Sequence, residues 1–222
     1  MGFSVLSHHR SVWLPIWSTV VTCLFLASCT QEPPDPPETQ AERLAKVRNA
    51  IGVAFTSPAN GDIAAFKEHV YTRAGEEAVT DVAFELNQLA FALKDELEKK
   101  FGQDALQKLD KNSSGKGFSL KVPPADPAWA QDLEIEFLDA KTAVTTNPFT
   151  ERNVFVVRHQ GRWLVDHTYE LDRPFDPQEL VSTFRAFAQA QAKALEVCKQ
   201  EGSTIEDVAT AAVGELFVIE KK

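Results

Sequence analysis

Hydrophobic positions in the first half of the chain recur every three or four residues, a spacing that predicts helices with one buried face. The first such segment covers 39–55 and stops before Pro58, because the residue preceding a proline avoids the helical conformation. Asp62 is well placed to cap a second, short helix, and a long third helix starts after Gly75 and ends at about Lys100. The apolar stripes of these helices are Leu44, Val47, Ile51 and Phe55; Ile63, Phe66 and Val70; and Val82, Leu86, Leu89, Leu93 and Leu97.

A short helix over 104–109 and a polar loop over 110–117 follow, and the hydrophobic pattern then changes to a period of two. This period predicts a strand with one apolar and one wet face around 132–137. The apolar face carries Leu133, Ile135 and Phe137, and the wet face carries Asp132, Glu134 and Glu136.

Two more strands, over 153–158 and 163–171, flank a turn that contains Gly161 and form a tight hairpin. Both faces of this hairpin are partly apolar, so helices or a lipid-like ligand must cover more than one side. A loop of two residues would pair Arg158 with Trp163, Val157 with Leu164, Val156 with Val165, Phe155 with Asp166, Val154 with His167 and Arg152 with Tyr169.

Two helices are predicted at the end of the sequence. Pro177 begins an alanine-rich helix that ends near Gly202, and Ser203 with Glu206 forms a capping box for the last helix. Their inward stripes are Leu180, Phe184, Phe187 and Leu195, and Ile205, Val208, Ala209, Ala212, Val213, Leu216 and Phe217. These elements predict an α+β fold: a helical N-terminal half, a small antiparallel sheet of about three to four strands, and C-terminal helices packing on it, in one globular domain over 39–222.

Before this domain, the segment 11–28 carries no charge and follows a short head with Arg10, which is the layout of a secretory signal. The residues Leu26-Ala27-Ser28-Cys29 at its end resemble the lipobox of bacterial lipoproteins. In that family the cysteine thiol receives a diacylglycerol, the peptide bond before it is cut, and the new amino terminus usually takes a further acyl chain such as palmitate. The resemblance implies that 1–28 is a signal peptide and that Cys29 is the lipidated first residue of the mature chain. The alternative is an uncleaved membrane anchor, which the polar or helix-breaking residues Pro15, Ser18, Thr19 and Thr22 disfavour.

The segment 29–38 is predicted to be a tether, because its residues 31–38 are polar and rich in proline and should form a semi-rigid extended spacer of roughly 25 Å at about 3.1 Å per residue. Thr30 follows the anchor. A residue other than Asp there resembles, in Gram-negative lipoproteins, cargo that is released to the outer membrane. We therefore expect an exported protein whose partner is a membrane, through the lipid on Cys29, in the cell membrane or the outer membrane.

Composition removes several classes of protein. The 222 residues carry a formal charge of −9, with a pI near 5.1, and no basic run, so we expect no nucleic-acid partner. Removal of 1–28 takes away one basic residue, Arg10, and no acidic one, which leaves −10. Three cysteines are too few for a disulfide scaffold, and Cys198 falls on an inner helical stripe as a buried thiol.

Metal sites and cofactors find little support in the sequence. Asp110, Asn112 and Ser114 are spaced like the start of a calcium loop, but Lys121 stands where a bidentate Glu belongs, which favours a polar turn. The acidic face of the strand at 132–137 is typical of a solvated surface. Since no zinc-ligand spacing and no Gly-x-Ser-x-Gly or Ser-x-x-Lys motif occurs, we expect neither a metal nor a cofactor.

The most suggestive chemical group is Trp163, Asp166, His167 and Tyr169 on the last predicted strand. Trp163, His167 and Tyr169 share one face, while Asp166 points to the other. A carboxylate that orients a histidine normally sits on the same side, so this pattern favours ordinary sheet packing first and a binding pocket second, ahead of a catalytic pair.

The segments 59–66 and 161–166 resemble parts of NTF2-like (cystatin-like α+β) domains. That resemblance implies a helix cluster on a curved antiparallel sheet around a cone-shaped pocket, in a family of isomerases, dehydratases and non-catalytic modules. Three hypotheses stay open. The first is a non-catalytic, lipid-anchored module that binds an envelope protein or a small apolar ligand. The second is an enzyme of hydratase, isomerase or hydrolase type that uses Asp166, His167 and Tyr169, and the third is an assembly or spacer lipoprotein that docks through the stripe over 208–217.

Overall fold

The structure is a computed structural model of the chain that describes residues 38–113, 118–171 and 175–219. Residues from Pro36 onward form one compact unit. The predictions for the signal peptide, for Cys29 and Thr30 and for the tether up to residue 37 concern residues outside this description, as does the stripe position of Phe217. Among the described residues, no helix is both long and apolar enough to cross a membrane.

The N-terminal helices agree with the predicted ones. Helix α1 (Gln40–Thr56) starts at a capping box in which Thr39 and Glu42 exchange hydrogen bonds, and the short 3₁₀ helix η1 (Ser57–Asn60) follows it. Helix α2 (Ile63–His69) is capped by Asp62, whose carboxylate accepts from the amide of Ala65 at 2.9 Å. The long helix α3 (Glu77–Phe101) ends one residue beyond the predicted Lys100.

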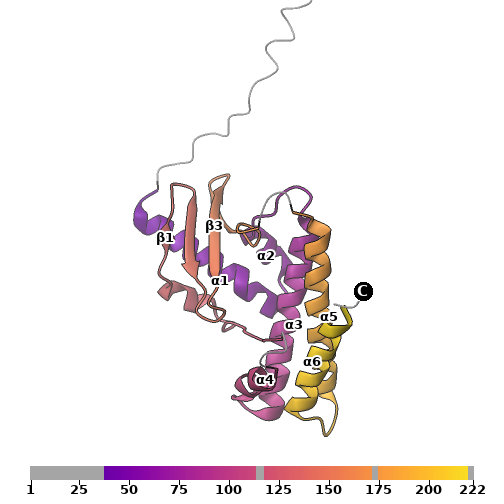
Figure 1. Ribbon diagram of the computed structural model, residues 1–222. Coiled ribbons are helices and arrows are strands. Elements are labelled where there is room, and N and C mark those ends of the chain that lie inside the picture. The colour runs from indigo at the N-terminus through magenta and orange to yellow at the C-terminus, as the bar shows by residue number, and fades with distance from the viewer. Residues whose placement is uncertain (1–37, 114–117, 172–174, 220–222) are drawn as a thin grey trace, which may run out of the picture. The chain divides into compact units, whose positions relative to one another are not determined.

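A four-stranded antiparallel sheet packs against these helices (Figure 1). Its strands β1 (Glu136–Phe137), β2 (Thr142–Thr146), β3 (Asn153–His159) and β4 (Arg162–Val165) are hydrogen-bonded in chain order. The predicted hairpin register is confirmed for Arg158 with Trp163, Val157 with Leu164 and Val156 with Val165. The α+β prediction, with C-terminal helices packing on the sheet, is therefore correct.

The observed sheet differs from the predicted one in the length of β4, in the length of β1 and in the presence of β2. Strand β4 stops at Val165, so the pairs Val154 with His167 and Arg152 with Tyr169 do not form. The chain turns there because the carboxylate of Asp166 accepts the amide of Thr168 at 3.0 Å. The predicted strand at 132–137 shrinks to β1, since the 3₁₀ helix η2 (Pro127–Asp132) occupies its start, and β2 was not predicted.

The predicted polar loop after residue 109 is also wrong, because helix α4 (Ala105–Ser113) continues through its first four residues. Asp110 therefore lies on a helix rather than in a loop. Its carboxylate accepts hydrogen bonds from the Ser119 hydroxyl at 3.1 Å and the Leu120 amide at 3.2 Å. This carboxylate closes the loop back onto the helix, while 114–117 lie outside the described residues.

Two C-terminal helices complete the unit, α5 (Pro177–Lys199) and α6 (Ile205–Ile219). Two predicted details need correction. The cap of α6 is shifted by one residue, since Thr204 and Asp207, not Ser203 and Glu206, exchange hydrogen bonds. Phe187 does not face inward but is 37% exposed. Cys198 is fully buried, and this burial raises the pKa of its thiol.

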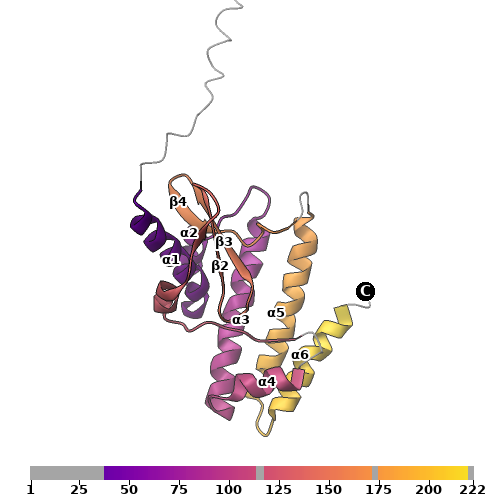
Figure 2. The same ribbon diagram turned by 60° about the vertical axis from the view of Figure 1, so that its left-hand side comes forward.

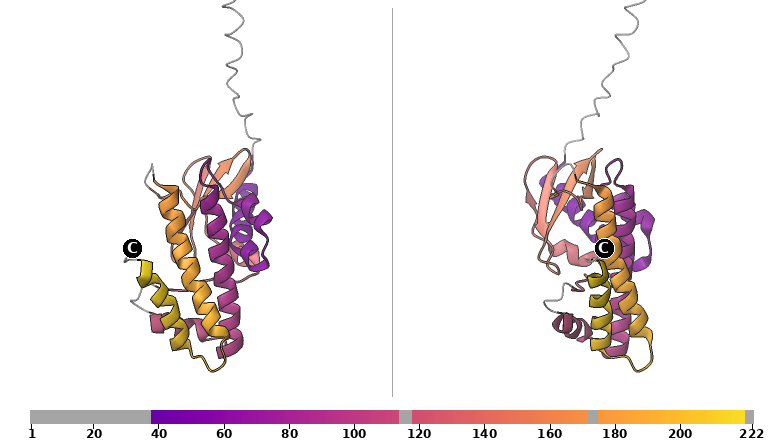
Figure 3. Two further views of the ribbon diagram at one scale, coloured as in Figure 1. Left: turned by 90° about the vertical axis from the view of Figure 1, so that its right-hand side faces the viewer. Right: turned by 45° about the vertical axis from the view of Figure 1, so that its right-hand side comes forward.

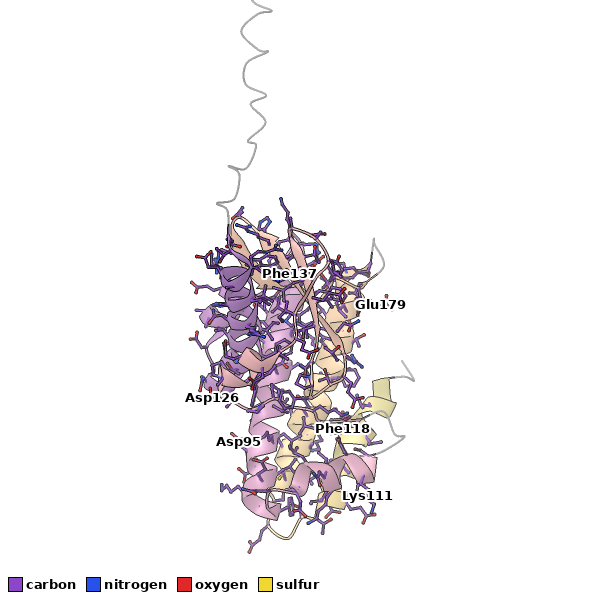
Figure 4. All side chains as sticks on the ribbon, turned by 90° about the vertical axis from the view of Figure 1, so that its left-hand side faces the viewer. Asp95, Lys111, Phe118, Asp126, Phe137 and Glu179 are labelled. Carbon is purple, nitrogen blue, oxygen red and sulfur yellow. The ribbon has the colours of Figure 1, made fainter. Side chains whose placement is uncertain are left out.

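Helices α3 and α5 lie side by side and join two separate cores (Figures 2 and 3). The sheet-side core packs α1, α2, η2, the sheet and the first half of α3 around Val47, Ile51, Phe66, Val156 and Val165. The helical core packs the second half of α3 with α4, α5 and α6 around Leu93, Leu97, Leu109, Ala194 and Val208. Figure 4 labels Phe137, which packs on the sheet-side core, and, lower in that view, Phe118 of the helical core.

Candidate ligand-binding site

A cavity of about 770 Å³ lies where strand β3 and the turn after β4 meet α3 and α5. Its wall draws on α1, α3, α5, the loop after β2, strand β3 and the turn after β4. The apolar part of this wall contains Phe55, Leu86, Phe155, Tyr169, Leu180 and Phe184, and the polar part contains Asn87, Asn147, Arg152, Asn153, Asp166 and His167. The cavity thus brings together three of the four sequence-predicted site residues.

His167 lies on the surface of this cavity, and its ring is accessible there although protein atoms surround it. Phe66 stacks against the ring with centroids 6.0 Å apart, and Phe55 meets it edge to face at 6.1 Å. None of the described residues forms a hydrogen bond with its ring nitrogens. Desolvation lowers the pKa of His167 below its ordinary value, and the opposing effect of Asp166 is smaller. The ring is therefore a neutral imidazole near pH 7, with one donor and one acceptor.

Asp166 is held by Arg73, which lies in the connector between α2 and α3. The guanidinium binds both carboxylate oxygens, with Nη1 at 3.0 Å from Oδ1 and Nη2 at 2.5 Å from Oδ2. This hydrogen-bonded pairing raises the pKa of Arg73. The Thr168 hydroxyl lies 2.6 Å from Arg73 Nη1 and 3.1 Å from a carboxylate oxygen of the buried Glu76. Asp166 therefore fixes the turn that carries His167, and its carboxylate binds Arg73 and the Thr168 amide.

Trp163 lies on the face of the sheet that packs on the sheet-side core, but it does not line the cavity. Its indole Nε1 donates to Glu38 at 3.2 Å, and Phe137 meets its ring edge to face with centroids 5.8 Å apart. Lys46 and Arg158 also approach Glu38, at 2.6 Å and 3.5 Å. Burial opposes ionisation of Glu38, but these donors outweigh it and lower the pKa of the carboxyl. Trp163 thus anchors the first described residues to the sheet.

The rim of the cavity is a short loop after β2. Asn147 is buried, and its side-chain oxygen accepts from the amides of Phe149 at 2.8 Å and Thr150 at 3.2 Å. Glu151 takes a left-handed backbone conformation with φ 57°, which turns the chain into β3. Arg152 is exposed beside it and lines the cavity. The rim therefore combines a rigid, hydrogen-bonded base with charged side chains that face solvent.

Sequence reasoning placed Phe55 and Phe184 on inner stripes but did not connect them with His167. Arg73 and Glu76 were missed altogether, because they stand in the connector between two helices, where no periodicity marks a buried position. Arg73 binds a carboxylate that lies 93 residues further along the chain. The Asn147-Pro148 dipeptide is a turn signal that could have indicated the rim.

Neither similarity to known proteins nor a metal-binding group among the described residues indicates what this chain does. Comparison with protein-family models, curated proteins and solved structures finds no match for this chain. Within the described ranges, no group of three or more His, Cys, Asp or Glu side chains could hold a metal ion. Asp132, Glu134 and Glu136 are all exposed. The cavity is therefore the feature of this chain that bears most directly on its function.

Proposed function

We propose that this chain is an exported lipoprotein, held at a membrane by acyl chains on Cys29, whose globular part binds a small, largely apolar ligand without transforming it. The observation that carries the binding function is the cavity of about 770 Å³, with its apolar wall and one accessible histidine. Small-molecule sites are typically cavities of about 300–1,000 Å³ lined in this way. Helices packed on an antiparallel sheet around a cavity also support an NTF2-like fold for the domain.

Binding is favoured over catalysis by the state of Asp166. An acid-base pair needs a carboxylate within hydrogen-bond reach of the histidine or of the substrate. Both oxygens of Asp166 instead bind Arg73, and its side chain is fully buried. His167 and Tyr169 line the cavity without that partner, so the enzyme hypothesis loses one of its three residues.

The spacer or assembly hypothesis has less support in the described residues. Its docking stripe on α6 is covered within the unit, because Val208, Ala209, Ala212 and Val213 are each less than 9% exposed. These side chains pack in the helical core against α4 and α5. A partner on this stripe would have to displace that core.

The binding function is tested with the fragment 36–222 and an uncharged apolar dye, N-phenyl-1-naphthylamine. The fragment contains both cores and needs no detergent, and thermal unfolding followed by circular dichroism checks that it folds. Leu86→Trp fills the cavity from α3, whereas Leu89→Trp, on the same helix and also partly buried, does not line the cavity.

We expect one dye site in the wild-type fragment and in Leu89→Trp, and a loss of at least about tenfold in affinity for Leu86→Trp, because an overfilled site cannot close around the dye. Equal binding by the two tryptophan variants would show that the dye sits elsewhere.

The membrane anchor is tested separately with the cysteines of the full chain. Cys29→Ser should abolish incorporation of labelled palmitate and leave the precursor uncleaved, because the lipid is attached to that thiol. Cys23→Ser is the matched control, since Cys23 lies in the same uncharged segment but not in the lipobox. Normal lipidation of Cys29→Ser would refute the lipoprotein proposal without affecting the cavity.

A further inference from the structure

The cavity wall is specific enough to narrow the ligand class, given the binding function proposed above. We infer that the ligand is a flat aromatic molecule with one uncharged hydroxyl group, and that this hydroxyl meets the ring of His167.

Aromatic rings make up much of the apolar wall. Phe55 enters from the end of α1 and Phe184 from the first turns of α5. Phe155 and Tyr169 stack on each other with centroids 4.3 Å apart and planes within 14°. Rings pack best against other rings, offset-stacked or edge to face. A rigid flat ligand also loses less conformational freedom on binding than a flexible acyl chain does.

His167 provides the hydrogen-bonding capacity inside this wall. Several neighbouring polar atoms are already engaged. Arg73 and Thr168 bind Asp166, two loop amides bind Asn147, and the Asn87 amide nitrogen donates to the carbonyl of Ala83 at 2.7 Å. A neutral imidazole offers one donor and one acceptor, and a hydroxyl is the simplest group that matches both. A ligand without such a group would leave the accessible imidazole unpaired, which weakens binding.

The charges around the cavity favour an uncharged group at this position. Among the described residues, the lining includes three acidic residues, Glu151, Asp166 and Glu170, and one arginine, Arg152. An anion would meet the carboxylates of Glu151 and Glu170, which outnumber Arg152 among the described charged residues at the rim. A cation would need a carboxylate close by, but Asp166 is bound to Arg73, and Glu151 and Glu170 are exposed at the rim. The pairing with His167 is therefore best made by a neutral hydroxyl.

The test compares four probes of one shape: naphthalene, 2-naphthol, 2-naphthoate and (2-naphthylmethyl)ammonium. Each is titrated into the fragment 36–222 in wild-type, His167→Phe and His159→Phe forms. Phe in place of His167 keeps a ring but removes both nitrogens. His159 is the control, because its ring packs on Tyr71 and does not line this cavity.

We expect the wild type and His159→Phe to bind 2-naphthol roughly 3- to 10-fold more tightly than naphthalene, which corresponds to one neutral hydrogen bond, and more tightly than either ion. In His167→Phe this preference should fall to about one. ¹⁵N shifts of the His167 ring give a second readout in the wild type, where 2-naphthol should move them more than naphthalene does.

Equal binding of naphthalene and 2-naphthol, an unchanged preference in His167→Phe, or tighter binding of an ion would overturn the hydroxyl inference while leaving the binding function intact. Failure of all four probes to bind, together with failure of the dye, would instead overturn the binding function and the inference with it.

Discussion

Leu97 and Leu86 lie on the same helix, α3, yet Leu97 is fully buried in the helical core and Leu86 lines the cavity beside the sheet-side core. The helical core is closed: its central leucines are inaccessible, and Lys100 ties its far end by donating to the carbonyls of Cys198 at 2.8 Å and Gln200 at 2.5 Å. The sheet-side core instead opens into a cavity of about 770 Å³.

This difference separates stability from binding. Long helices that belong to both cores can leave one end open because the other end is packed around fully buried leucines. At the open end, the pair between Arg73 and the buried Asp166 carboxylate fixes the turn on which His167 stands, whereas the closed end is held by apolar packing. Substitutions at the two ends should therefore affect different measurements.

The largest effect is expected in the helical core. Leu97→Ala should lower the free energy of unfolding by about 2–5 kcal/mol, because it creates a cavity in a closed core. Leu86→Ala, which enlarges an existing opening, should cost less than half as much. Urea unfolding of the fragment 36–222 measures both. A similar loss for the two variants would contradict the distinction between closed and open cores.

Removal of Arg73 tests the ion pair of the open end. Arg73→Met leaves the buried carboxylate of Asp166 without its partner and should cost about 2–4 kcal/mol, somewhat less than for a completely buried pair, because the Arg73 side chain is 30% exposed. Arg152→Met removes an exposed arginine near the same cavity and should change stability by less than about 0.5 kcal/mol. If both variants unfold at the same urea concentration, the Asp166 pair does not hold the turn.

A pH-dependent effect should be confined to the open end. Desolvation lowers the pKa of His167, so the unfolded chain binds a proton there at a higher pH than the folded chain does. The contribution of neutral His167 to the free energy of unfolding is therefore complete above the ordinary histidine pKa of about 6.5. It is lost as the pH falls toward the pKa of His167 in the folded chain. The charged groups that line the cavity with His167 are Glu151, Arg152, Asp166 and Glu170.

Urea midpoints between pH 8 and pH 5 measure this effect. The wild type and His159→Phe should lose stability more steeply than His167→Phe as the pH falls. Parallel curves for all three would show that His167 titrates alike in the folded and unfolded chains.

The smallest effect is expected at Phe187, which the helical pattern placed inside but the structure places at the surface of α5. Phe187→Ser should change the urea midpoint by the equivalent of less than about 0.5 kcal/mol. Phe184→Ser, one turn earlier on the cavity wall, should reduce dye binding by at least about threefold through lost apolar contact. A marked loss of stability in Phe187→Ser would favour the predicted inward position.

Local signals predicted most of the fold. Thr39, Asp62 and Pro177 stand at or next to the helix starts, and the turn with Gly161 sets the register that pairs Arg158 with Trp163. The prediction failed where a distant partner decides the structure. Strand β4 ends at Val165 because Asp166 turns away to Arg73, and α4 extends because Asp110 binds the chain near Leu120.

The candidate site was predictable only in part for the same reason. Periodicity placed Trp163, Asp166, His167 and Tyr169 on one strand, whereas β4 ends at Val165, and it could not show that Trp163 would bind Glu38 instead of lining a pocket. The cavity itself is built from five separate segments. Its rings, Phe55, Phe155 and Phe184, meet only through tertiary packing, which no pattern within one segment contains.

The most direct test of the central claim is a methyl NMR titration of the fragment 36–222 with N-phenyl-1-naphthylamine. The account predicts that methyl signals of the cavity residues Leu86, Val154, Val165 and Leu180 shift, while those of Leu93, Leu97, Leu109 and Val208 in the helical core stay in place. Shifts confined to the helical core, or spread evenly over both cores, would contradict the assignment of the open, sheet-side end as the ligand-binding site.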